Sequence, residues 1–264
     1  MKDPRRIICI HGYGVRSFFW TPIKLRLERY FEQVITPDLH MEDIPSAISE
    51  VEELARIHAR ESGQPVILFG HSLGGILSAM AGMRLEEGDI DSLIIMASPY
   101  GERRKGMNPV LKLLLKYRLI PGWMVRSQFF GKATPEHIKK ELFDNAVPES
   151  LSIQEAVAKP KWFHTDELKL PVLHRVLGLA SEADRIVAAR ETQQFTEALG
   201  GEFYRFPQAL DIGHDDFTVF EPAIDHVLRI IVPFLGLELS EGDRGSKAHE
   251  DLIDGDDAES LVMD

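Results

Sequence analysis

The segment Gly70-His71-Ser72-Leu73-Gly74 combines residue types that suit nucleophilic chemistry. It follows an apolar run, residues 65–69, and precedes a helix-like stretch, residues 75–83. The pattern Gly-x-Ser-x-Gly between a strand and a helix is typical of a sharp turn that exposes a serine hydroxyl above a sheet. The serine in such a turn has a positive φ, and side chains two residues before and after it would clash, so glycine is required at both places. We therefore interpret Ser72 as a nucleophile; the alternative is a glycine-rich turn without a catalytic role.

A serine nucleophile needs a general base and an acidic residue that orients the base. In this kind of arrangement the chain order is serine, then Asp or Glu, then histidine. Asp184 follows an expected strand at residues 172–180, and His214 follows the next one at 203–206. Of the ten histidines, only His214 lies in the loop directly after the last expected strand, where Gly213 precedes it. We expect both residues at the C-terminal ends of neighbouring parallel strands. Asp184 is the predicted acid, and Glu182 in the same loop is the alternative.

A loop near the N-terminus is a candidate for the donors that stabilise an oxyanion. An apolar run at residues 6–10 is followed by His11-Gly12-Tyr13-Gly14. A turn here can direct the backbone N–H of Tyr13 toward the same point as the N–H of Leu73, at the positive end of the helix that follows Ser72. Two such donors form an oxyanion hole and contribute about 2.7–4 kcal/mol each to transition-state stabilisation. The alternative is a glycine turn that only connects two elements.

The rest of the pattern indicates the elements that must position these residues. Short apolar runs that are typical of strands alternate with helix-like segments, which predicts an α/β fold with a mostly parallel sheet and helices on both faces. The expected strands before the middle of the chain are residues 6–10, 33–36, 65–70 and 92–97, and the expected helices are residues 20–30, 45–61 and 74–87.

Residues 101–169 interrupt this alternation. They contain helix-like stretches separated by prolines, and a structureless loop of this length would be unusual in a compact domain. We interpret the segment as a helical cap inserted between two strands, over the active site. The expected cap helices are residues 110–118, 121–130, 135–144 and 152–158.

Together these motifs resemble the α/β-hydrolase superfamily. The resemblance covers about residues 5–236 and is carried by His11-Gly12-Tyr13-Gly14 with Trp20 downstream, Gly70-His71-Ser72-Leu73-Gly74-Gly75, Ser181–Val187 and Gly213-His214. It implies an α/β-hydrolase core in which Ser72 is the nucleophile, Asp184 the acid and His214 the base, with Tyr13 and Leu73 as oxyanion donors. It also implies that apolar cap residues such as Trp123 and Phe129 line an acyl pocket; packing within the cap is the alternative for both. The sequence departs from the family in having no early antiparallel strands.

The predicted function is that of a serine hydrolase, carboxylesterase-like or lipase-like, which cleaves a small-molecule ester or thioester through an acyl-enzyme on Ser72. The same three residues would also suit hydrolysis of a carbon–carbon bond or acyl transfer, because a fold does not determine its chemistry. A non-catalytic binding module on the same scaffold is a further alternative. Such proteins usually lack one of the three residues, and here all three are present.

Composition excludes several other classes of function. The net charge of −12 argues against a nucleic-acid-binding protein. No apolar run approaches the length of a transmembrane helix, and the start of the chain has no signal-peptide pattern. The single cysteine, Cys9, excludes an intramolecular disulfide and favours a cytoplasmic location. We expect no metal and no cofactor, since no His or Cys cluster has ligand spacing and no glycine-rich loop resembles a nucleotide site.

Charge is unevenly distributed along the chain. Residues 101–140 contain ten basic side chains against two acidic ones, whereas residues 237–264 contain ten acidic against two basic. A basic cap could make weak contact with an anionic surface or an acyl carrier protein; ordinary solvated helix faces are the alternative. The predicted organisation is a hydrolase core at residues 1–100 and 170–236, a cap at 101–169 and an acidic, disordered tail at 237–264.

Overall fold

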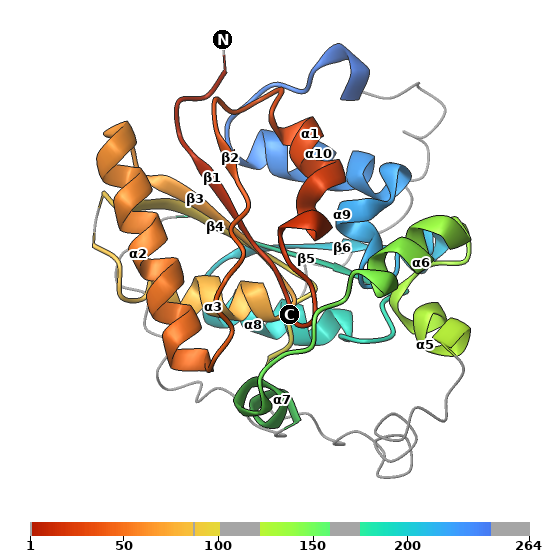
Figure 1. The fold of residues 1–264 in the computed structure, drawn as a ribbon. Helices are drawn as coiled ribbons and strands as arrows, with labels where there is room; N and C mark the ends of the chain where they lie inside the picture. The colour runs from red at the N-terminus through yellow and green to blue at the C-terminus, as the bar shows by residue number, and fades with distance from the viewer. Residues whose placement is uncertain (1, 87, 101–121, 159–174, 244–264) are drawn as a thin grey trace, which may run out of the picture.

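The computed structural model describes the chain except for residues 1, 87, 101–121, 159–174 and 244–264 (Figure 1). Its sheet has six strands in the order β2-β1-β3-β4-β5-β6, and every neighbouring pair is parallel. The strands are β1 (Ile7–Ile10), β2 (Val34–Ile35), β3 (Val66–His71), β4 (Ile90–Met96), β5 (Val176–Ser181) and β6 (Glu202–Phe206). The predicted α/β fold with a parallel sheet is confirmed.

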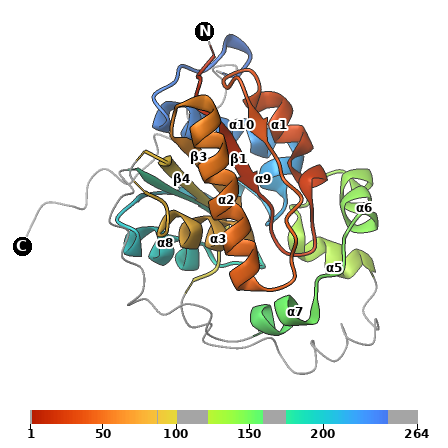
Figure 2. The ribbon, with the colours of Figure 1, turned by 60° about the vertical axis from the view of Figure 1, so that its left-hand side comes forward.

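Helices cover both faces of the sheet, as predicted (Figures 1 and 2). Successive side chains of a strand point to opposite faces. Ile7 and Cys9 of β1 therefore pack in one hydrophobic cluster, and Ile8 and Ile10 pack in the other. The first cluster contains α1 (Thr21–Leu27), α9 (Asp216–Val219) and α10 (Glu221–Phe234); the second contains α2 (Ile44–Ser62), α3 (Leu73–Gly82) and α8 (Ala189–Ala198). Because β1 is buried on both faces, it appears in the sequence as a continuous apolar run.

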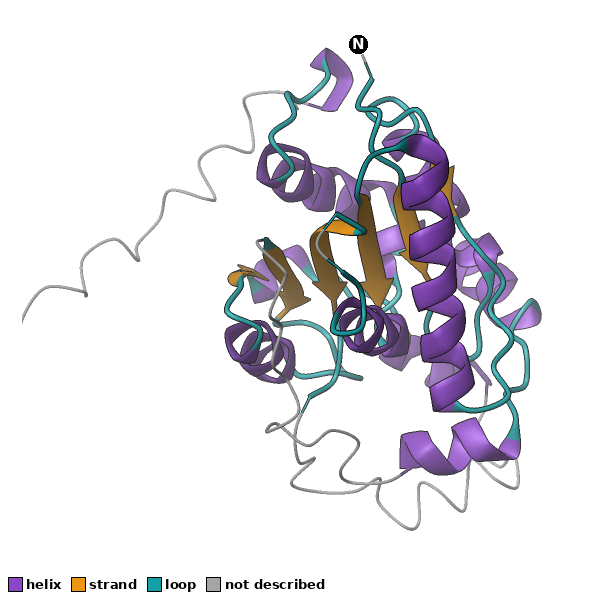
Figure 3. Ribbon diagram, turned by 90° about the vertical axis from the view of Figure 1, so that its left-hand side faces the viewer, coloured by secondary structure: helices purple, strands orange, loops and turns teal. Residues whose placement is uncertain are grey.

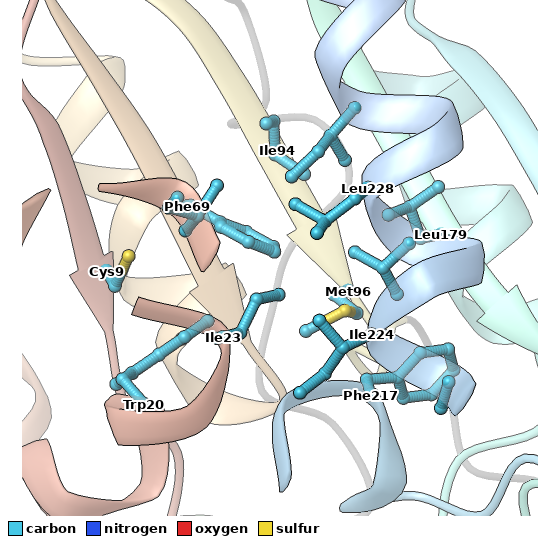
Figure 4. Close-up of a cluster of buried hydrophobic side chains, with 14 of the residues drawn as sticks. Cys9, Trp20, Ile23, Phe69, Ile94, Met96, Leu179, Phe217, Ile224 and Leu228 are labelled. Atoms are coloured by element: carbon cyan, nitrogen blue, oxygen red, sulfur yellow. The ribbon is translucent and has the colours of Figure 1, made fainter. Parts of the chain in front are cut away.

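The core between the sheet and α10 is shown in Figure 4. Met96 of β4 and Leu179 of β5 meet Ile224 and Leu228 of α10, and all four side chains are fully buried. Each such side chain contributes roughly 1.5–3 kcal/mol through removal from water. Cys9 lies in the same cluster, where burial raises the pKa of its thiol, so it is a small apolar core residue. This packed core holds the strand ends, and hence the loops that follow them, in place.

Helix ends agree with local sequence signals. The side chain of Asp43 caps α2 by accepting a hydrogen bond from the Ser46 N–H at 2.7 Å, and Pro45 lies in the first turn. The helix ends at Gly63, which adopts the left-handed conformation at φ 65°. The helix expected at residues 20–30 is shorter in the structure: a 3₁₀ turn, η1 (Ser17–Trp20), precedes α1. Helices α8 and α10 have no counterpart among the expected elements.

The described residues between β4 and β5 include three helices. They are α5 (Gly122–Phe129), α6 (Glu136–Asp144) and α7 (Leu151–Ala158), close to three of the four expected cap helices. Figure 3 shows the strand arrowheads directed toward the end of the molecule where α7 lies. The fourth expected helix, residues 110–118, lies outside the described residues, as do the basic side chains of residues 103–118 and the side chain of Trp123 within α5.

The C-terminal segment differs from the expected tail at its start. Leu237 and Leu239 pack against the core, so residues 237–243 are not a disordered extension. The side chain of Asp243, which is 1 % exposed, accepts a hydrogen bond from the Tyr30 hydroxyl at 2.5 Å and pairs with Arg26. These contacts attach residues 237–243 to α1 and the residues that follow it. Residues 244–264, the rest of the expected tail, lie outside the described part of the chain.

Candidate active site

The turn between β3 and α3 has the geometry that its glycines predict. Ser72 has φ 54° and ψ −121°, a positive-φ conformation outside the left-handed helical region that is unfavourable for a residue with a side chain. A Cβ atom on Gly70 would lie 2.4 Å from the carbonyl oxygen of Gly74. A Cβ atom on Gly74 would lie 2.1 Å from the carbonyl oxygen of Ile10. Both neighbours are backbone atoms that cannot move aside cheaply, so glycine is required at the two positions.

Leu73 is the first residue of α3. The N–H of the first residue of a helix has no carbonyl partner within the helix. It also lies at the positive end of the helix dipole. Its backbone N–H is therefore suited to bind a negatively charged oxygen next to Ser72.

Asp184 and His214 meet at the carboxyl ends of β5 and β6. The Nδ1–H of His214 donates to Oδ2 of Asp184 at 2.8 Å, and both side chains are buried. The other oxygen, Oδ1, accepts the backbone N–H groups of Ile186 and Val187 at 2.8 and 3.0 Å. With both oxygens engaged, the carboxylate is fixed in orientation. Because His214 donates through Nδ1, its neutral ring presents the lone pair of Nε2, the form that a general base requires.

Glu182, the alternative acid, faces away from His214. Its side chain is exposed and accepts the backbone N–H of Gln208 at 3.1 Å. The guanidinium of Arg205 lies 3.7 Å from its other oxygen. The structure thus brings Asp184, and not Glu182, into contact with the histidine.

The loop after β1 lies directly against the serine turn. A Cβ atom on Gly12 would lie 3.1 Å from Cβ of Ser72, so a side chain at position 12 would require the serine turn to shift by a few tenths of an ångström. Nε2 of the buried His11 accepts the backbone N–H of Leu39 at 3.1 Å, so the ring proton is on Nδ1, which donates to the Gly12 carbonyl at 3.0 Å. Burial lowers the pKa of His11, which keeps the ring neutral. The role of this side chain was not predicted from the sequence.

The bond from His11 also constrains the N–H of Tyr13. The Gly12 carbonyl and the Tyr13 N–H belong to one planar trans peptide and point in opposite directions. Holding the carbonyl therefore holds the direction of the N–H. Within the described part of the chain, no hydrogen-bond acceptor is found for this N–H, which suits a group that binds substrate. The phenol ring of Tyr13 is partly exposed.

His71 contacts His214 from below the turn. Its Nε2–H donates to the backbone carbonyl of His214 at 2.8 Å, and the two rings lie 4.7 Å apart. Burial, together with the positive charge that His214 carries when protonated, holds the pKa of His71 well below its usual range. His71 is therefore a neutral hydrogen-bond donor. The only feature of the sequence that indicated a role for His71 was its position directly before Ser72.

Asp215 adds a second buried carboxyl group beside His214. Burial raises the pKa of Asp215 to about 7; protonated His214 opposes this rise, and Asp184 and Asp216 add to it. His71, His214 and Asp215 place potential metal-ligand atoms within 4.8 Å of one another. One nitrogen of each histidine is already engaged, by Asp184 for His214 and by the His214 carbonyl for His71. The cluster thus forms part of the same site as the histidine–aspartate pair.

A comparison with protein families identifies the chain. The model described as the alpha/beta hydrolase family matches residues 7–226. The chain belongs to the α/β-hydrolase family. No curated protein sequence matches it.

Solved structures share the fold of this α/β hydrolase at low sequence identity. An esterase from Exiguobacterium antarcticum has a TM-score of 0.70 and 18% identity, over 89% of this chain and 93% of that chain. The esterase RhEst1 from Rhodococcus sp. ECU1013 has a TM-score of 0.66 and 14% identity, over 90% and 94% of the two chains. The type II thioesterase BorB from the borrelidin biosynthetic cluster has a TM-score of 0.63 and 23% identity, over 88% and 92%. These likenesses establish the fold.

The inserted segment of the α/β hydrolase reaches its histidine loop. The ring of Phe129, at the end of α5, lies 6.1 Å from the ring of His214, and the Phe129 carbonyl accepts the N–H of Asp215 at 2.9 Å. The buried Asp216 accepts the N–H groups of Gly131 and Gly213 at 2.6 and 2.7 Å. These bonds hold residues 129–131 of the insert and the His214 loop together. Phe129 is therefore next to the predicted base, whereas the position of the Trp123 side chain is not described.

None of the helices in the described ranges of this α/β hydrolase has both the length and the apolar character that crossing a bilayer demands.

Proposed function

We propose that this α/β hydrolase is a serine hydrolase that cleaves a carboxylic ester or a thioester of a small molecule. The observation that carries the proposal is the buried hydrogen bond between His214 and Asp184 at the same edge of the sheet as the strained Ser72 turn. An orienting carboxylate, a base whose Nε2 carries a lone pair and a serine hydroxyl in a strained turn are the parts that acyl transfer to serine requires.

In the first half of the reaction, Nε2 of His214 takes the proton of Ser72 as Oγ bonds to the substrate carbonyl carbon. The carbonyl oxygen becomes negatively charged and is held by the N–H groups of Tyr13 and Leu73. Asp184 stabilises the imidazolium and keeps its orientation. When the bond to the leaving group breaks, the alcohol or thiol departs with the proton from His214, and the acyl group stays on Ser72.

In the second half, water attacks the acyl-enzyme and gives a proton to His214. The bond to Ser72 breaks, the carboxylic acid leaves, and the proton returns to Ser72 Oγ. Phe129 lies beside His214 and is proposed to contact the acyl chain during both steps. The esterases and the thioesterase of the same fold support this class of substrate.

Covalent labelling tests the proposal directly. A fluorophosphonate probe should modify Ser72, identified by mass spectrometry of the labelled peptide, and the probe should abolish turnover of p-nitrophenyl esters or acyl-CoA thioesters. Comparing the two substrate series separates esterase from thioesterase. Absence of both labelling and hydrolysis would contradict the proposal. Labelling without hydrolysis, accompanied by acylation of an added alcohol, would identify an acyltransferase instead.

A further inference from the structure

The insert makes a second contact with the catalytic loops, at the loop that contains Tyr13. The N–H of Gly14 donates to Oε1 of Glu149 at 2.8 Å. The carbonyl of the same glycine accepts the N–H of Val147 at 2.8 Å. Gly14 has φ 76°, a conformation accessible to glycine at little cost. Residues 147–149 therefore hold both polar groups of Gly14, directly after the expected oxyanion donor.

An ion pair reinforces this contact. Glu149 has a fully buried carboxylate that receives two N–H groups of Arg16, at 2.7 Å to Oε1 and 3.1 Å to Oε2. Arg16 lies two residues beyond Gly14, so Glu149 holds the loop at two points. We call Glu149, Val147, Gly14 and Arg16 the loop clamp. Such fork-shaped arginine–carboxylate pairs are directional as well as strong, and they suit a positioning task.

The clamp completes the constraint on Tyr13. His11 holds the peptide before Tyr13 through the Gly12 carbonyl, and Glu149 holds the peptide after it through the Gly14 N–H. With the peptide planes on both sides fixed, the Tyr13 N–H has one direction. Because glycines flank Tyr13, the chain itself imposes little conformational restriction here.

We infer that Glu149 is a positioning residue that holds the Tyr13 N–H in the orientation needed to bind the oxyanion. The inference rests on the proposed function and extends it, because it gives the insert a part in transition-state stabilisation. The positive charge of Arg16 offsets the negative charge of Glu149, so the clamp does not oppose a developing oxyanion. A preorganised donor is effective because it need not reorient during the reaction.

The test compares Glu149→Gln with a matched buried carboxylate elsewhere. Glutamine keeps an oxygen for the Gly14 N–H but loses the ion pair with Arg16. Asp243→Asn is the control, because the carboxylate of Asp243 is equally buried and pairs with Arg26 at the C-terminal segment. Arg16→Lys is a milder second variant that retains the charge and loses the fork.

Four quantities are measured for each variant: kcat and KM on a p-nitrophenyl ester, the inhibition constant of a trifluoromethyl ketone, which forms a tetrahedral oxyanion on the serine, and the melting temperature. Glu149→Gln should lower kcat about 10- to 100-fold, less than the roughly 10²- to 10³-fold loss for complete removal of a donor. KM should stay within about twofold, and ketone binding should weaken in parallel with kcat. Arg16→Lys should show the same pattern with a smaller loss.

Asp243→Asn should lower the melting temperature and leave kcat and ketone binding unchanged. If Glu149→Gln behaves like this control, the clamp is only structural and the inference is wrong. If Glu149→Gln does not fold, Arg16→Lys takes its place: lower kcat and weaker ketone binding support the inference, and a change in melting temperature alone contradicts it. Amide hydrogen exchange of residues 11–16, faster in either clamp variant than in the native protein, tests the clamp even if the native protein hydrolyses no substrate. The failure of the proposed function and the failure of the clamp are thereby distinguishable.

Discussion

His71 donates a hydrogen bond from Nε2 to the backbone carbonyl of His214, 143 residues further along the chain, at 2.8 Å. The residue next to the candidate nucleophile thus supports the backbone of the candidate base. The centroids of the His71 and His214 rings also lie 4.7 Å apart. The ring of Phe19 packs against His71 as well, with a centroid separation of 4.8 Å. The serine turn and the histidine loop are joined directly, without the acid loop between them.

Replacing His71 by phenylalanine should keep the ring packing and remove the donor. The His214 carbonyl would then be buried without this partner, which costs about 1–3 kcal/mol. We expect kcat to fall roughly tenfold, by displacement of the base, with little change in KM. His58→Phe, in α2 and hydrogen-bonded to Arg6, is the control and should affect stability alone. Unchanged kcat in the His71 variant would show that the bond has no influence on the base.

The assignment of the acid is tested by two neighbouring substitutions. Asp184→Asn should reduce kcat by about 10⁴-fold, because the imidazole loses its orienting charge and its correct tautomer. Glu182→Gln should change kcat by less than about threefold, since that side chain is exposed and bonded to Gln208. Ser72→Ala and His214→Ala should each reduce ester hydrolysis by at least about 10³-fold with folded, thermally stable protein. A damaging Glu182 variant beside a mild Asp184 variant would reverse the assignment.

Asp215 should make stability fall as pH rises toward neutrality. Its carboxyl group has a pKa of about 7 in the folded protein and near 3.8 when unfolded, so between these values only the folded state retains the proton. Stability then decreases with increasing pH, by as much as roughly 1.4 kcal/mol per pH unit, and levels off above pH 7. Asp215→Asn removes this contribution, and its free energy of unfolding should exceed that of the native protein more at pH 8 than at pH 4.5.

Urea unfolding at a series of pH values measures this difference. Asp144→Asn, an exposed acid on α6 that pairs with Lys140, is the control for removal of one carboxylate. A constant offset between Asp215→Asn and the native protein would mean that Asp215 does not titrate in this range.

Phe129 is expected to select the acyl chain. Its half-buried ring lies 6.1 Å from that of His214 and 5.5 Å from that of Phe143. Phe129→Ala should change kcat/KM for long-chain p-nitrophenyl esters more than for the acetate, by roughly tenfold. Leu151→Ala in α7 is the control, because the side chain of Leu151 is 75 % exposed. It should leave the dependence of kcat/KM on acyl-chain length unchanged. Equal losses of the Phe129 variant on all esters would favour simple packing.

Local patterns were sufficient for much of the fold and for the placement of two of the candidate residues at strand ends. Parallel strands buried on both faces are continuous apolar runs, and the glycines around Ser72 are required by atoms of the same turn and of the adjacent β1. These constraints act over a few residues, so they appear in the sequence. The order of Ser72 and His214 relative to the strands follows from them.

Residues 237–243 show where composition misleads. Their acidic and polar character is typical of a disordered tail, yet Leu237 and Leu239 pack against the core and Asp243 forms an ion pair with Arg26. Burial of two apolar side chains and a paired carboxylate offsets the loss of chain entropy. Whether residues 237–243 can reach the core and Arg26 depends on the position of the C-terminal end of α10, which the local sequence does not specify.

Which of Asp184 and Glu182 contacts His214 was decided by the tertiary structure, because both acids lie in one short loop and only the path of that loop directs one of them to His214. The contact between Gly14 and Glu149 joins residues 135 positions apart, and that between His71 and His214 joins residues 143 apart. The amino-acid sequence by itself determined which turns are possible at each strand end. Packing of the sheet and the insert decided which of these turns meet, because a hydrogen bond between distant segments depends on the position of every element between them.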